Sequence, residues 1–491
     1  MLSLAFDNSY WQELTGFYSE CSPEQVPDAQ LVYFNHTLAE EIGVDAADSD
    51  PAELASIFSG NHLPDGAQPI AQVYAGHQFG SFNPQLGDGR AHLLGEVLSP
   101  TGERWDIALK GSGKTPYSRG GDGKAAIGPM LREVLISEAM HSLGIPTTRS
   151  LAVVLTGEAV YRETALPGAV LTRVAASHLR IGTFQFYASR GQQEAVKKLA
   201  DYTITRHYPE AKNATNPYLA MLNGVVEQQA NLIAQWMGGG FIHGVMNTDN
   251  MSLAGETIDY GPCAFMDAYY PHTVFSSIDH HGRYAYRNQP AIAQWNLARF
   301  AEALISLIDD DTDKAIELAT ESVLRFDTLY QNSWQRVMAT KLGFSESLLT
   351  EQQSLIDDWL ALLKNTQTDF TLAHYYLIFA AQGDSTRLME LIGDPQQLDV
   401  WLAQWQQLRQ ENNVDTTAII ERMQKQNPRI IPRNHHVEYV LKEASENGNY
   451  QPFKQFLTAL HNPYSQDVLF DEWQHPADPE FTRDYQTFCG T

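Results

Sequence analysis

The sequence predicts an α+β fold in which a small β-rich lobe precedes a larger, mainly helical lobe. Residues 71–176 contain several short segments of strand pattern around a single helical pattern at 129–143, whereas residues 291–412 have helical periodicity almost throughout. Between these regions, a polar loop at 241–261 carries Asn and Asp side chains after an apolar lead-in. We interpret this loop as the part of the chain that carries the chemistry.

Turn-forming residues separate the expected elements. A turn rich in Ser, Pro and Gly joins strands at 91–98 and 104–110, and Pro129 and Gly144 suit the first and C′ positions of the helix. We expect residues 1–70 to form short helical pieces and turns without chemistry. Further strands are expected at 149–155, 158–163 and 169–176, and helices at 192–208, 216–237, 291–308, 312–330, 345–364, 368–382 and 395–412.

The composition excludes several classes of protein. With 33 Lys and Arg against 59 Asp and Glu, the formal net charge of −26 argues against a general binder of nucleic acids or anionic membranes. No apolar stretch approaches a membrane span of about 20 residues, and the N-terminal residues lack the pattern of a signal or transit peptide. Three cysteines without CxxC spacing exclude a zinc ribbon and a disulfide scaffold, so we expect a reducing compartment and a cytoplasmic protein.

The loop at 241–261 combines oxygen ligands at close spacing. Asp249 and Asn250 follow His243, and Asp259 comes nine residues after Asn250. The pattern predicts a short hairpin at 251–258 that brings Asn250 and Asp259 to the same end. A few carboxylate and amide oxygens together with phosphate oxygens suit Mg²⁺.

The same spacing is typical of kinase-like phosphotransferases, with one departure. In those enzymes an Asn follows His-x-Asp after five residues and an Asp-x-Gly comes later. Here Asn250 stands seven residues after His243 and Asp259 begins Asp-Tyr-Gly, but Val245 occupies the position of the usual base. The nearby carboxylate is Asp249. The alternative is an ordinary loop of turn formers with solvated side chains.

Upstream residues support the phosphotransferase interpretation. Lys110 ends a strand of the pattern Asp-Ile-Ala-Leu-Lys, and Glu133 on the next helix is its natural partner. By itself Lys110 is better explained as an edge-strand lysine that prevents aggregation, and Glu133 together with the downstream Asp-Tyr-Gly reverses that preference. The glycine-rich loops at 87–90 and 120–123 offer backbone N–H groups, and Arg173 with Arg180 can clamp a phosphate; ordinary turns and surface ion pairs are their alternatives.

Residues 108–115 match a relaxed P-loop. A P-loop requires that its Lys-Thr pair opens a helix whose N-terminus faces the phosphates. Lys114 and Thr115 are instead followed by Pro-Tyr-Ser-Arg-Gly-Gly-Asp-Gly, which is incompatible with that helix. The context of this motif therefore argues against a P-loop NTPase.

Three long motifs identify a family. They are YAGHQFGxxxPQLGDGRAxLLGE, LKGSGxTPYSRxxDGKAxxxxxLRE and HGVMNTDNMSxxGxxIDYGPxxFMD, and Asn-Pro-Arg at 427–429 and Pro-Arg-Asn at 432–434 extend the match to the C-terminal part. Together they resemble the selenoprotein O (SelO) family. The resemblance implies a protein-kinase-like bilobal fold and a protein adenylyltransferase that binds ATP flipped relative to kinases. It would transfer AMP to Ser, Thr or Tyr hydroxyls of protein substrates and release pyrophosphate.

The resemblance also assigns residues. It implies Asp249 as the proton acceptor, Asn250 and Asp259 as Mg²⁺ ligands, and Glu133 as the partner of Lys110. Asp259 would also contact ATP, and the remaining ATP contacts would be Gly87, Gly89, Arg90, Lys110, Asp122, Gly123, Arg173 and Arg180. A displaced base and additional arginines are consistent with attack at the α-phosphorus, because the β- and γ-phosphates must then be held as the leaving group.

The expected organisation has four parts. They are an N-terminal extension at 1–70 that packs on the core, a nucleotide-binding lobe at 71–165, a mainly helical lobe at 166–426 and a C-terminal extension at 427–491. We expect a monomer. Three alternatives remain open: transfer of UMP with Mn²⁺, transfer of the γ-phosphate as in true kinases, and a nucleotide-binding scaffold without catalysis.

Some family members pair a C-terminal Sec or Cys with a Cys that follows Asp-Tyr-Gly. Cys489 fits the first position, but residues 271–281 contain no Cys and the nearest is Cys263. A bridge between Cys263 and Cys489 is therefore a hypothesis for redox control.

Overall fold

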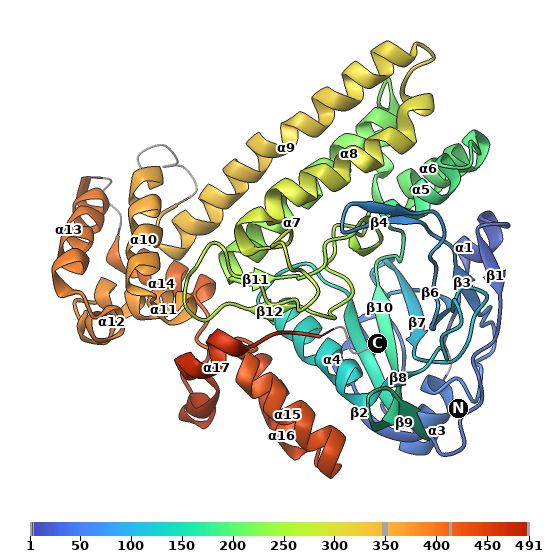
Figure 1. Cartoon of the computed structure of the whole chain (residues 1–491), viewed down its shortest axis with the longest axis horizontal. Helices are drawn as coiled ribbons and strands as arrows, with labels where there is room; N and C mark the ends of the chain where they lie inside the picture. Colours follow the sequence, from blue (N-terminus) through green and yellow to red (C-terminus); the bar gives the residue numbers. More distant parts are fainter. Residues whose placement is uncertain (1, 3, 346–351, 412–414, 489–491) are drawn as a thin grey trace.

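The computed structural model describes residues 2, 4–345, 352–411 and 415–488. Figure 1 shows a twisted sheet built from the first third of the chain, long helices of the middle third crossing above it, and the C-terminal helices grouped beside both. The chain is thus mixed α+β, with an antiparallel sheet followed by a largely helical portion, as the sequence predicts. No helix in the described ranges is both long and apolar enough to cross a membrane.

The sheet is antiparallel throughout its described pairings. Lys110 at the end of one strand pairs with Leu171 of the next, and Ala108 pairs with Arg173, so the register places Lys110 and Arg173 close together. The strand order is β1 (Tyr18–Glu20), β3 (Ile70–Gln72), β6 (Ala91–Leu98), β7 (Arg104–Lys110), β10 (Ala165–Ala175), β9 (Arg149–Tyr161) and β2 (Gln30–Phe34), with β8 (Ala125–Ala126) on β10.

Both faces of the sheet are buried. Ile107 and Leu109 of β7 point into a cluster with α2 (His36–Glu41) and α3 (Pro51–Phe58). Ala108 points to the opposite face, which is covered by α4 (Ile127–Ser142). Because side chains alternate along a strand, Lys110 shares the α4 face with Ala108 and meets that helix.

Two predictions about strands are wrong. The strands expected at 149–155 and 158–163 form one continuous strand, β9. Gly157 lies between the two expected strands with φ +74°, a conformation that glycine adopts readily, and the strand continues through it. Residues 1–70 also do more than form helical pieces: β1 and β2 join the sheet at opposite edges, and β2 pairs with β9.

The helical portion is organised around α7 (Pro217–Gly239), α8 (Gln289–Ile308) and α9 (Thr312–Lys341), which pack side by side. The helix predicted at 312–330 is longer than expected. The predicted start of the helix at 345–364 lies outside the described residues, and α10 is described from Gln352. The other helices are α1 (Ser9–Glu13), α5 (Ile181–Ala188), α6 (Gln193–His207), α10 (Gln352–Thr366), α11 (Phe370–Ala381), α12 (Thr386–Ile392), α13 (Pro395–Glu411), α14 (Thr416–Gln426), α15 (Asn434–Asn447), α16 (Gln451–Leu460) and α17 (Pro479–Asp484), with 3₁₀ turns η1 (Pro209–Asn213), η2 (Thr248–Asn250), η3 (Tyr286–Asn288) and η4 (Val468–Trp473).

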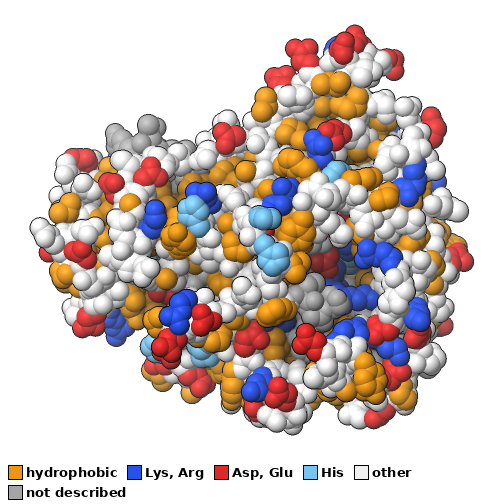
Figure 2. All heavy atoms as spheres, in the orientation of Figure 1, with side chains coloured by type: hydrophobic (Ala, Val, Ile, Leu, Met, Phe, Trp, Pro, Cys, Tyr) orange, Lys and Arg blue, Asp and Glu red, His pale blue; other side chains and the backbone are white. Residues whose placement is uncertain are grey.

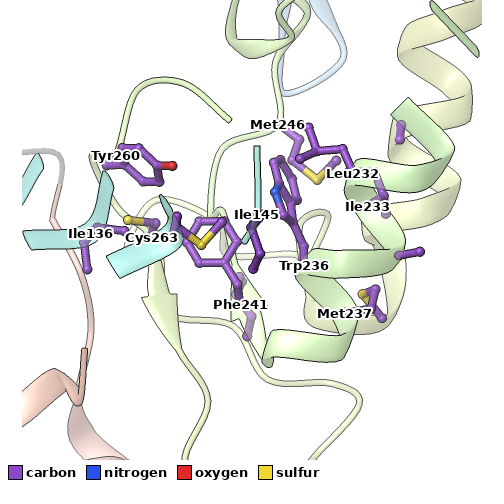
Figure 3. Packing of buried hydrophobic residues seen from close by; sticks show 14 of the residues in the cluster. Ile136, Ile145, Leu232, Ile233, Trp236, Met237, Phe241, Met246, Tyr260 and Cys263 are labelled. Atoms are coloured by element: carbon purple, nitrogen blue, oxygen red, sulfur yellow. The ribbon is translucent and has the colours of Figure 1, made fainter. Parts of the chain in front are cut away.

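A rigid apolar base supports the polar loop. Figure 3 shows Trp236 of α7, Phe241, Tyr260 and Cys263 packed together with Ile145, and all of these side chains are buried. Phe241 begins β11 (Phe241–Ile242), which pairs with β12 (Ala264–Phe265) on the far side of the loop. The ends of the loop are therefore fixed by packing and by a short ladder.

The hairpin predicted at 251–258 does not form. The backbone of this segment pairs with other parts of the chain: Leu253 N–H donates to Leu179 O at 2.9 Å, and Thr257 N–H donates to Pro146 O at 3.0 Å. Buried backbone groups must find partners, and here the partners are the segments that lead into α5 and β9. Asn250 and Asp259 nevertheless line the same cavity.

Candidate active site

A cavity of about 1520 Å³ opens between the sheet, α4, the polar loop and the C-terminal helices. Figure 2 shows a hollow on this face with Lys and Arg side chains gathered beside it. The lining carries as many Lys and Arg as Asp and Glu, so cationic side chains are enriched at the cavity relative to a chain of net charge −26. The residues that line the cavity include each predicted site residue: Gly87, Gly89, Arg90, Lys110, Asp122, Gly123, Glu133, Arg173, Arg180, Asp249, Asn250 and Asp259.

Lys110, Glu133 and Arg173 form a buried ionic cluster. Lys110 Nζ donates to Glu133 Oε2 at 2.6 Å, and Arg173 Nε donates to Glu133 Oε1 at 2.8 Å. The Glu133 side chain is 3% exposed and buried with Met130 on the sheet-facing side of α4. Each oxygen of one carboxylate is thus occupied by a different cation, which fixes both cations in place.

Asp259 joins this cluster from the polar loop. Its Oδ1 accepts from Lys110 Nζ at 3.2 Å and from Arg173 Nη2 at 2.5 Å, and its Oδ2 lies 3.4 Å from Arg180 Nη1. Arg173, Lys110 and Arg180 hold the pKa of Asp259 well below its usual range despite its burial. The carboxylate is therefore ionised, and its side chain remains 23% exposed toward the cavity.

The backbone at Asp259 is strained. Its φ is +64°, in the left-handed region that a residue with a Cβ seldom adopts. The preceding residue is held by His243, whose Nε2 donates to Ile258 O at 2.9 Å while its Nδ1 accepts from Val245 N–H at 3.4 Å. Burial lowers the pKa of His243, so the ring is neutral and acts as a structural link between the two halves of the loop.

Asp249 lies in the same cavity but in a different environment. The residue is 8% exposed, its Oδ1 is buried without a hydrogen-bond partner among the described residues, and its Oδ2 accepts from Gln78 Nε2 at 3.4 Å. Desolvation raises its pKa to about 6, partly offset by the charge of Arg180. A carboxylate that is ionised at neutral pH and holds a proton more tightly than usual is suited to act as a general base.

The side-chain amide of Asn250 is oriented so that its oxygen is available to bind a metal ion. Its Nδ2 donates to Val245 O at 2.9 Å, which turns the opposite end of the amide away from Val245. Val245 therefore provides a backbone acceptor at the position where kinases carry a base. Asn250 and Asp259 together present an amide oxygen and a carboxylate to the cavity, a donor set that fits Mg²⁺ bound with phosphates.

The predicted glycine positions line the cavity beside the charged cluster. A Cβ at Gly87, which has φ +135°, would lie 2.6 Å from the Tyr117 ring, and one at Gly89 would lie 2.9 Å from Tyr117 O. Ser118 Oγ donates to Gly89 O at 2.6 Å. The loops that contain Gly87 and Tyr117 are therefore packed closely enough to exclude larger residues.

Asp122 lies apart from the charged cluster. Its Oδ2 accepts from Arg162 Nη1 at 2.8 Å, and this contact lowers the pKa of Asp122.

The segment at 108–115 does not have the structure of a P-loop. Thr115 donates its hydroxyl to Asp88 O and is followed by turns, and the next helix begins only at Ile127.

Sequence reasoning missed several residues of the site. Arg180 stacks its guanidinium 4.6 Å from the centroid of the Tyr74 ring, and its Nη2 lies 4.0 Å from Asp88 Oδ1. Gln78 contacts Asp249. Tyr74, Gln78 and Asp88 all fall within the first family motif, so the motif marked the segment without showing which side chains reach the cavity.

Cys263 is fully buried, and desolvation raises the pKa of its thiol to about 12. Cys489 lies outside the described residues. Thr487 Oγ1 donates to Pro262 O at 2.7 Å, which places the chain shortly before Cys489 next to the residue before Cys263. The bridge between Cys263 and Cys489 stays a prediction.

Comparison with known proteins identifies the family. The family described as "Protein adenylyltransferase SelO" matches residues 1–461. A "Protein nucleotidyltransferase YdiU" from Chromobacterium violaceum is 57% identical over 470 residues, which are 96% of this chain and 98% of the relative. Proteins with the same name from Maridesulfovibrio salexigens (50% over 488 residues, 99% and 98% covered) and Anoxybacillus flavithermus (51% over 487 residues, 99% and 99% covered) are also similar. The chain therefore belongs to the SelO family of protein adenylyltransferases.

Proposed function

We propose that this enzyme has a protein-kinase-like bilobal fold and transfers AMP from ATP to Ser, Thr or Tyr hydroxyl groups of protein substrates, with release of pyrophosphate. One observation carries the proposal. A poorly solvated carboxylate, Asp249, shares a cavity with three cations, Lys110, Arg173 and Arg180, that converge on Asp259. Asp249 is suited to accept a proton, and the three cations are suited to hold a polyphosphate.

The cations are placed to bind the leaving group. Lys110 and Arg173 are held by Glu133, and Arg180 is held by its stacking on Tyr74, so little reorganisation is needed when a phosphate arrives. Asn250 and Asp259 would hold Mg²⁺, with Mn²⁺ as the alternative, and the metal would neutralise charge on the phosphates.

Asp249 would act on the acceptor. Its carboxylate takes the proton of the acceptor hydroxyl as the oxygen attacks the α-phosphorus; the bond between that phosphorus and the bridging oxygen breaks, and pyrophosphate leaves beside Lys110, Arg173 and Arg180. Attack at this phosphorus explains why the base stands at Asp249 and why Val245 occupies the usual position. The ATP contacts expected at Gly87, Gly89, Arg90, Asp122 and Gly123 belong to the same proposal.

The alternatives make different demands on the site. Transfer of the γ-phosphate as in kinases would require a basic side chain at position 245, and valine cannot accept a proton. A scaffold without catalysis would need neither Asp249 nor the paired oxygens of Asn250 and Asp259. Transfer of UMP would use the same residues and is separated by a direct comparison of ATP and UTP. The monomeric state and cytoplasmic location expected from the sequence stay predictions.

The proposal is tested by Asp249→Ala with ATP labelled at the α-phosphate. We expect loss of covalent label on protein while ATP binding, measured by calorimetry, is retained. The exposed Asp310→Ala is the matched control and should label as the wild type does. Normal labelling by Asp249→Ala would remove Asp249 as the base, and loss of ATP binding would show that the residue is structural.

A further inference from the structure

A short hairpin lies against η2, the turn that carries Asp249. It consists of β4 (Gly76–Gln78) and β5 (Ser81–Asn83), and Figure 1 shows it between the sheet and the long helices. His77 N–H donates to Thr248 Oγ1 at 2.7 Å, and Phe79 N–H donates to Asn247 Oδ1 at 3.1 Å. The hairpin therefore binds consecutive residues that lead to Asp249.

A buried relay strengthens this attachment. Thr248 Oγ1 donates to Gln185 Oε1 at 2.6 Å, and the amide of Gln185 lies 2.9 Å from His77 Nδ1. Gln185 belongs to α5, whose N-cap is Arg180 of the charged cluster. The hairpin, the turn η2 and the helix that begins after Arg180 are thus connected through three side chains.

Strand β4 contacts both oxygens of Asp249. A Cβ at Gly76 would lie 2.5 Å from Asp249 Oδ1, so the absence of a side chain there allows this oxygen to be buried against the strand. Gln78 Nε2 donates to Oδ2 at 3.4 Å, and the Gln78 side chain lines the cavity. Because Oδ1 is closed off, an acceptor hydroxyl reaches this carboxylate through Oδ2.

We propose that Gln78 is a positioning residue for AMP transfer: its carboxamide holds Asp249 Oδ2 in the orientation in which that oxygen receives the acceptor proton. This inference rests on the proposed role of Asp249. The competing orientation is a turn of the carboxylate toward Arg180, whose Nη1 already donates to the Asp249 carbonyl at 3.3 Å. A salt bridge with Arg180 would occupy the oxygen that must accept the proton.

The test separates donation from packing. Gln78→Met removes the donor and keeps an unbranched side chain of similar length, whereas Gln78→His keeps a neutral N–H donor when it is assayed at pH 8. We expect Gln78→Met to lower kcat for protein labelling about tenfold, the loss of one hydrogen bond to a charged group, with the KM for Mg-ATP and the melting temperature unchanged. Gln78→His should retain most of the activity at pH 8, and the exposed Gln85→Met should behave as the wild type does.

Several results would overturn the inference. An unchanged kcat in Gln78→Met would show that the contact does not matter, and equal losses in the Met and His variants would assign the effect to packing. Gly76→Ala gives an independent check, since displacement of Oδ1 should lower kcat while ATP binding survives; full activity of this variant would contradict the described placement. Failure of Asp249→Ala to abolish labelling would instead refute the proposed base.

Discussion

Replacing Glu133 with Gln isolates the contribution of the buried charge cluster. The change preserves the shape of the side chain and its place on α4 but removes the negative charge between Lys110 and Arg173. Both cations are largely buried, and after the change they face the single carboxylate of Asp259. We expect both lower stability without nucleotide and lower activity, because Lys110 loses the partner that orients it.

The magnitude follows from the burial of the partners. Removing one member of a buried ion pair costs about 3–5 kcal/mol. The amide oxygen of the substituted side chain still accepts a hydrogen bond from Arg173, so the lower end of about 3 kcal/mol applies. In a chain of this length each kcal/mol corresponds to about 1–2 °C in melting temperature, scaled from smaller domains. The expected decrease is therefore roughly 3–6 °C.

Thermal unfolding followed by circular dichroism measures this effect in nucleotide-free protein. The exposed carboxylate Glu317, on α9, provides the matched control, and Glu317→Gln should leave the melting temperature unchanged. A Glu133→Gln variant that melts within a degree of the wild type would refute the reasoning, because the cations would then not depend on Glu133.

Three further predictions concern other parts of the molecule. Burial lowers the pKa of Lys341 from 10.5 in the unfolded state to about 7 in the folded protein. Between these pH values the unfolded state binds more protons, so the stability of the wild type rises by about 1.4 kcal/mol per pH unit. Lys341→Met should therefore raise the free energy of unfolding by roughly 4 kcal/mol at pH 7 and by much less at pH 10, and an equal gain at both pH values would contradict this. Gly87→Ala should weaken ATP binding about tenfold in calorimetry, because φ +135° and the Tyr117 ring oppose a Cβ, at a cost of about 1–3 kcal/mol; unchanged affinity would show that the loop adapts freely. Oxidised protein should yield a peptide linking Cys263 to Cys489 on non-reducing mapping, and its absence would remove the redox hypothesis.

Local patterns predicted the elements whose structure depends on local signals. Strands β6 and β7 have the predicted bounds, since alternation and a turn define them, and the partnership of Lys110 with Glu133 followed from a strand lysine and a helix glutamate in the expected order. The burial of Arg173 and Arg180 was not readable from their spacing, which left surface pairing open.

The errors have a common physical origin in distant partners. Residues 251–258 have hairpin spacing, but their backbone groups bond to segments more than 70 residues away in sequence. In β9, Gly157 lies between the two predicted strands, and its φ of +74° does not end the strand because β2 and β10 pair on either side. The role proposed for Gln78 likewise depends on a contact 171 residues away in sequence, which the motif around it does not reveal.

The most direct test of the proposed reaction is a paired labelling experiment. Purified protein with Mg²⁺ receives ATP labelled at the α-phosphate in one reaction and at the γ-phosphate in another, with a protein acceptor in both. We expect covalent label on protein from the α-phosphate alone. Label from the γ-phosphate alone would make the enzyme an ordinary phosphotransferase and contradict the roles given to Asp249, Arg173 and Arg180.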